Sequence, residues 1–298
     1  MTQHGVRLAL SQEDAAYLRR EDTVAIHDDI SPANLITAGL ELESQQLVFS
    51  FILFMLMLTL SFTCRIRLKH DNGKLDSSAT MLQLAEMQER KNSLHRKIKA
   101  WTVIRHLYMP EVAAMRTRAD RAASDTSHEI APFDFPLYLP SSLPSRITCL
   151  PILRRYECKL LEAQALEALD ELRDHLRLRT HIYKYKDKNI VGQRVNTRCQ
   201  NIITGVQDKV NASATKYRTA RAALVKLSSS CSENQDWRGR LLPLDPEDIR
   251  SLKDDEEGQS EGNRTLSWIW KVVGVGGDAD DEGLQEGKYF SILTFDMT

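Results

Sequence analysis

Cationic side chains and two tyrosines are concentrated at one point of the sequence, between two long amphipathic stretches. Five lysines and arginines in segment 183–198 face a single acid, Asp187. Cations neutralise phosphates and exposed rings stack on bases, so this pattern predicts a nucleic-acid-binding surface. The candidate binding residues are Arg177, Arg179, Tyr183, Lys184, Tyr185, Lys186, Lys188, Arg194 and Arg198. The alternative interpretation is a solvated hairpin tip that its lysines keep soluble.

Recognisable catalytic and metal-binding motifs are missing from the sequence. The sequence contains no nucleophile elbow, phosphate loop or zinc-protease motif, so we expect no enzyme activity and no cofactor. Asp170 and Asp174 share a helix face, but Arg173 and Arg177 beside them favour pairing within the helix. The acidic run from Asp278 begins like a calcium loop, yet its twelfth position is a tyrosine, and we therefore predict no metal site.

The candidate residues lie at the turn of a predicted helical hairpin, Leu153–Leu227. Its first arm has an apolar stripe that recurs every three or four residues, formed by Leu161, Ala165, Leu169, Leu172 and Leu176. The stripe of the second arm comprises Val195, Cys199, Ile202, Val206, Val210, Tyr217, Ala220, Leu224 and Leu227, with Ser213 its only polar interruption. Gly205 lies inside the second arm, where it marks either a close helix approach or a tolerated cost of about 1 kcal/mol.

A third long helix is expected near residues 80–109, ended by Pro110. Packed against the hairpin, it gives an all-α fold of long antiparallel helices, a three-helix bundle or coiled coil. The predicted segments are 78–115 for this helix, 116–150 for a proline-rich connector, 151–273 for the hairpin with a C-terminal strap, and 274–298 for a weakly ordered acidic tail.

Residues 1–46 form a short helical lead-in, with N-caps predicted at Ser11 and at Ser31 before Pro32. The following stretch, Leu47–Cys64, contains no charged residue and would span about 27 Å as a helix, close to the thickness of a thin bilayer. If it spans a membrane, the basic residues after it would place the C-terminal part in the cytosol. On hydropathy alone, a single-pass membrane anchor is the favoured interpretation.

Composition limits the class of partner. The chain of 298 residues has a formal net charge of -1, so any attraction to nucleic acid must be local. Its five cysteines are scattered, without metal-ligand spacing, which predicts free thiols in a reducing compartment.

Several stretches resemble, in order and over nearly the whole chain, the C-terminal region of fungal KDZ (Kyakuja-Dileera-Zisupton) transposase-related proteins. They are Ser31–Glu43, Gln88–Val112, LYLPSSLPSR from Leu137, EAQALEALDELR from Glu162, GQRVNTR from Gly192, KYRTARAAL from Lys216, PEDIR from Pro246 and LSWIW from Leu266. The resemblance implies a transposable-element-derived segment without the family's catalytic core, so no catalytic residue is carried over.

The resemblance also offers a second interpretation of Leu47–Cys64. In the family, the helix that ends here at Gln46 continues directly into a basic stretch, which in this chain resumes at Arg65. Our hypothesis is therefore that the apolar segment is a translated intron, in preference to a true membrane anchor. Three partners follow from these alternatives: DNA, a self or partner helix, or a membrane; no small-molecule substrate is implied. The corresponding locations are a membrane with a cytosolic C-terminal part, or the cell interior, including the nucleus.

Overall fold

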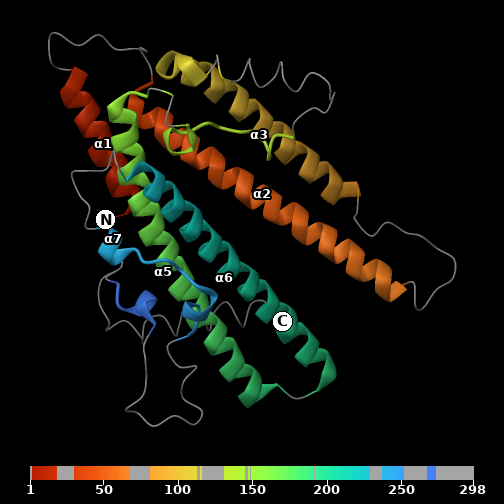
Figure 1. The fold of residues 1–298 in the computed structure, drawn as a ribbon. Helices are drawn as coiled ribbons and strands as arrows, with labels where there is room; N and C mark the ends of the chain where they lie inside the picture. The colour runs from red at the N-terminus through yellow and green to blue at the C-terminus, as the bar shows by residue number, and fades with distance from the viewer. Residues whose placement is uncertain are drawn as a thin grey trace. The chain divides into compact units, whose positions relative to one another are not determined.

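The computed structural model describes residues 2–18, 30–67, 81–112, 115, 131–144, 147, 149–190, 192–228, 237–251 and 267–272, with only the backbone described for 51–67 and 81–84. All regular elements in these ranges are helical (Figure 1), so the predicted all-α class is confirmed. The chain forms two compact units, Arg7–Glu157 and Met1–Val6 with Cys158–Thr298.

The first unit begins with α1 (Gln3–Leu18) and α2 (Pro32–Arg67). The predicted cap of α2 is confirmed, because the Ser31 hydroxyl accepts the N–H of Asn34 at 3.3 Å with Pro32 in the first turn. The predicted cap at Ser11 is wrong. The helix already begins at Gln3, where the Thr2 hydroxyl accepts the N–H of Gly5 at 3.1 Å, so Ser11 lies inside it.

A buried carboxylate joins three elements of this unit. Asp14 of α1 accepts the hydroxyl of Tyr156 at 2.8 Å and the N–H of Ala33 at 3.3 Å. Burial, followed by the bond to Asp14 and its charge, raises the pKa of Tyr156, so the phenol stays protonated and keeps donating. The start of α2 is thereby fixed against α1 and the first turns of α5 (Pro151–Asn189).

The third long helix is α3 (Met81–Tyr108), and it packs antiparallel on α2. The Trp101 indole donates to the carbonyl of Leu35 at 3.0 Å, and Gly39 allows the close approach. A Cβ at Gly39 would lie 2.6 Å from Cδ2 of Leu139 and 2.8 Å from Cζ2 of Trp101. The packing of α3 on α2 was not anticipated from the sequence, and the three-helix bundle of α3, α5 and α6 stays a prediction.

The predicted apolar segment belongs to one uninterrupted helix. α2 continues through Leu47–Cys64 to Arg67, and Phe49 is buried against Phe133 with ring centroids 5.5 Å apart. No helix is both long and apolar enough to cross a membrane among the residues whose side chains are described. The side chains of 51–67 lie outside that description, and so does the membrane prediction that depends on them.

The second unit contains the rest of α5 and the helix α6 (Gln193–Leu227), which form the predicted hairpin (Figure 1). The predicted stripe residues of both helices are buried, with two exceptions near the start of the α6 stripe. Val195 is 41% exposed, and Ile203 replaces Ile202 as the buried residue of its turn. The buried stripe of α6 therefore starts at Cys199.

Two short segments cover this hairpin. The first holds α7 (Trp237–Arg240) and η2 (Pro246–Asp248), a single 3-10 turn with a capping box between Asp245 and Asp248. Its backbone carbonyls accept bonds from Tyr217, Arg218 and Arg221 of α6.

The second segment, residues 267–272, is called here the C-terminal strap and contains η4 (Trp268–Trp270). Arg173 of α5 donates to the carbonyl of Ile269 at 2.6 Å and to that of Val272 at 2.5 Å. Ile269 is fully buried. These bonds hold the strap on α5, whereas the predicted tail 274–298 lies outside the described residues.

Candidate nucleic-acid interface

The predicted interface lies at the tip of the α5–α6 hairpin. α5 ends at Asn189 and α6 begins at Gln193, so the two helices are joined by a very short connection. Gly192 has a φ of 104°, a backbone conformation that favours glycine. The predicted turn is confirmed, and the short connection makes the helices antiparallel neighbours.

A small apolar cluster supports the tip from inside. Its buried members are Ile182 of α5 with Cys199, Ile203 and Val206 of α6, and Leu178, Ile190 and Ile202 pack around them. Because this cluster uses the inner face of both helices, the charged residues between its members are directed to the sides and outward.

Three of the candidate residues bind other parts of the second unit. Arg177 pairs with Asp174 at 3.2 Å and lies over the Trp270 ring at 5.4 Å. Arg179 donates to Oε1 of Gln207 at 2.7 Å, and Lys186 donates to Oε1 of Gln200 at 3.2 Å. These side chains have a structural role between the helices and the strap.

Five candidate residues are exposed at the tip: Tyr183, Lys184, Lys188, Arg194 and Arg198. The four cations among them form no hydrogen bond or ion pair within the described part of the chain. Lys184 and Lys188 are four residues apart on α5, as are Arg194 and Arg198 on α6, so each pair shares a helix face. Tyr185 is half-buried and offers less of its ring. The tip thus presents four available cations and one open aromatic ring.

The predicted pairing of Asp170 and Asp174 with neighbouring arginines of α5 is confirmed. Asp170 contacts Arg173 at 2.5 Å, and Asp174 contacts Arg177, both three residues apart on α5. Among the described residues no cluster of histidine, cysteine or carboxylate side chains could hold a metal ion. The acidic run from Asp278 lies outside those residues.

One polar contact inside the hairpin was not predicted. Nδ1 of His175 lies 3.1 Å from Oγ of Ser213, which explains the single polar interruption of the α6 stripe. Burial, together with Lys209, lowers the pKa of His175, so the imidazole is neutral near pH 7. The contact gives the buried hydroxyl of Ser213 a hydrogen-bond partner inside the hairpin.

The cysteine prediction requires a correction. Cys149 and Cys199 are free thiols, as expected, but Cys158 is disulfide-bonded. Wide spacing in sequence did not reveal this bond, because a disulfide depends on Cα atoms that the fold brings together.

Comparisons with protein-family models, curated proteins and solved structures give no match to this chain. The candidate interface is therefore argued from its own residues. The resemblance to KDZ transposases stays a prediction.

Proposed function

We propose that this chain is a non-catalytic helical segment of a KDZ transposase-like protein, that α3, α5 and α6 form its three-helix bundle, and that the hairpin tip contacts DNA. One observation carries the DNA contact: Lys184, Lys188, Arg194 and Arg198 are exposed together without a partner in the described residues. Unpaired cations attract a polyanion through release of its counterions. The global charge of -1 supplies no such attraction, so the contact is local.

Salt dependence provides a quantitative test. If all four cations neutralise phosphates, log K for a duplex should fall with log salt concentration with a slope of about -4. Lys184→Glu/Lys188→Glu should make that slope shallower by about 2 and weaken binding strongly at low salt. Fluorescence anisotropy with a labelled duplex, measured over a series of salt concentrations, gives both quantities.

The matched control is Arg96→Glu/Lys99→Glu, two exposed cations of α3 three residues apart. It changes the net charge by the same amount at another place. Equal losses in the two variants would mean that only total charge matters, and the proposed interface would be wrong. Lys186 is left unchanged because its bond to Gln200 makes any effect partly structural.

Tyr183 tests whether bases contribute. Replacing an exposed stacking ring weakens single-strand binding by about 1–3 kcal/mol for each base. Tyr183→Leu should therefore weaken binding to a labelled single strand while leaving the salt slope unchanged. If Tyr183→Leu leaves the single-strand affinity unchanged, the ring does not stack on bases and the proposed interface contacts only phosphates.

A single-pass membrane anchor is the second candidate function, favoured by the continuity of α2 through Leu47–Cys64. The burial of Phe49 against Phe133 in a protein contact argues against it at the start of that stretch. Extraction of the expressed full chain by alkaline carbonate, without detergent, would exclude the anchor. Sequencing of the mature transcript across these codons would separate it from a translated intron.

A further inference from the structure

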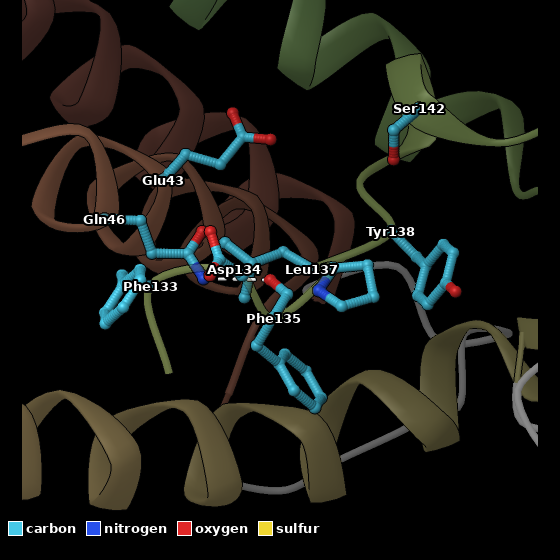
Figure 2. A pocket seen from close by; sticks show the side chains of 9 residues that line it. Glu43, Gln46, Phe133, Asp134, Phe135, Leu137, Tyr138 and Ser142 are labelled. Carbon is cyan, nitrogen blue, oxygen red and sulfur yellow. Dashed lines mark hydrogen bonds between the residues drawn. The ribbon is translucent and has the colours of Figure 1, made fainter. Parts of the chain in front are cut away.

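A pocket of about 330 Å³ lies in the first unit between α2 and the connector (Figure 2). Glu43 and Gln46 come from α2, and the other lining side chains come from residues 133–142. They include three aromatic rings, Phe133, Phe135 and Tyr138, and a second carboxylate, Asp134. None of the lining residues is basic.

The connector that forms the wall is held at several points. Nε2 of Gln46 donates to the carbonyls of Pro132 and Phe135, both at 2.9 Å, and the side chain of Arg105 donates to the carbonyl of Leu137. The guanidinium of Arg105, fully buried, also lies over the Tyr138 ring at 5.8 Å. These contacts position the rings before any ligand arrives, which reduces the entropy lost on binding.

Two carboxylates, Glu43 and Asp134, line the pocket, and a third carboxyl group lies near it. Glu157, next to the connector, is fully buried and accepts the N–H of Ser141 at 2.9 Å through Oε2. Its Oε1 has no hydrogen-bond partner among the described residues. Burial raises the pKa of Glu157 to about 8, although the hydrogen bond from Ser141 lowers it. The negative charge of Glu43 raises this pKa further. Glu43 is thus close enough to Glu157 for the two carboxyl groups to repel each other when both are ionised.

From this combination we propose that the pocket binds an organic ammonium group, with Glu43 and Asp134 as counter-charges and Phe135 and Tyr138 as ring contacts. Aromatic faces attract cations through the ring quadrupole, and the attraction is strongest for a weakly hydrated ammonium. The pocket lies in the first unit, so this proposal is independent of the DNA contact at the hairpin tip.

Choline is a suitable probe, because 3,3-dimethylbutan-1-ol has nearly the same shape without the charge. Titrations of each compound into the full chain, followed by ligand-detected NMR, give two dissociation constants. Choline should bind about 10-fold more tightly than the alcohol, corresponding to a cation–ring and ion-pair contribution of ordinary size. Equal binding of the two compounds, or no saturable binding of choline, would overturn the proposal.

Glu43→Gln keeps the shape of the side chain and removes its charge. It should weaken choline binding several-fold without changing the dissociation constant of the alcohol. The matched control, Glu89→Gln, removes an exposed carboxylate of α3 that does not line the pocket. Circular dichroism confirms that both variants are folded. If Glu43→Gln and Glu89→Gln reduce choline binding equally, the ligand is attracted only by net charge, and the pocket is not its site.

Discussion

Glu157 should make the stability of the first unit depend on pH above the usual range of a carboxylate. The side chain is fully buried, one of its oxygens has no partner in the described residues, and burial raises its pKa from 4.5 to about 8. Between these two pH values the folded protein holds a proton that the unfolded chain has released. The free energy of unfolding therefore falls as pH rises through this window.

The magnitude follows from the width of that window. Within it, the unfolding equilibrium constant rises about tenfold for each pH unit, and the whole interval corresponds to about 5 kcal/mol. A series from pH 6 to pH 9 covers only the part of this interval between pH 6 and pH 8. The expected loss of unfolding free energy over the series is therefore about 3 kcal/mol. Below pH 4.5 both states are protonated and the effect disappears.

Glu157→Gln removes this titration, since the amide is neutral at every pH and its oxygen can still accept the Ser141 N–H. Urea denaturation followed by circular dichroism at pH 6, 7, 8 and 9 should give a flatter pH profile for the variant than for the parent chain. Glu89→Gln, which removes an exposed carboxylate, should follow the parent. Parallel profiles for the parent and Glu157→Gln would refute the reasoning, because the carboxyl would then be ionised in both states.

The other predictions concern single side chains. Gly205→Ala should stabilise the chain by about 1 kcal/mol in urea denaturation, because a Cβ there meets nothing within 4 Å and helix propensity improves. A loss of stability would show that α6 is not helical or is covered at this point. Gly39→Ala should destabilise it by about 1–3 kcal/mol in the same assay, because its Cβ would clash with Leu139 and Trp101; an unchanged midpoint would disprove the close approach of α2. Arg173→Met should release the C-terminal strap, because both carbonyl bonds are lost, and limited proteolysis should then cleave near the strap faster. Equal cleavage rates would mean that apolar contacts alone hold it.

The helical elements were accessible from the sequence because periodicity and capping are local properties. The stripe of α5, the cap at Ser31 and the pairing of Asp170 with Arg173 each involve residues at most four positions apart. Such patterns depend on the geometry of a single helix. These predictions were confirmed. The predicted burial of Val195, the stripe residue nearest the hairpin turn, was wrong, because the buried cluster of the tip begins in α6 at Cys199.

The candidate interface was only partly accessible. The charge pattern and the tyrosines selected nine candidate residues, but they could not separate exposed cations from those that bind other side chains. Arg177 stacks on Trp270 of the strap, and Lys186 reaches Gln200 across the hairpin. These partners lie far along the chain or on the other helix, so only packing could reveal them.

By itself, the sequence determined the all-helical class, the hairpin and the position of its basic tip, because these follow from side-chain periodicity and from the turn residues. Tertiary structure alone decided the pairing of α3 with α2, the burial of Glu157 and Arg105, and the aromatic pocket beside them. A charged side chain in a sequence carries no sign of burial, because burial depends on which distant segments displace water from it. The connector supplies that cover through hydrogen bonds from Gln46 and Arg105, formed between residues that are tens of positions apart.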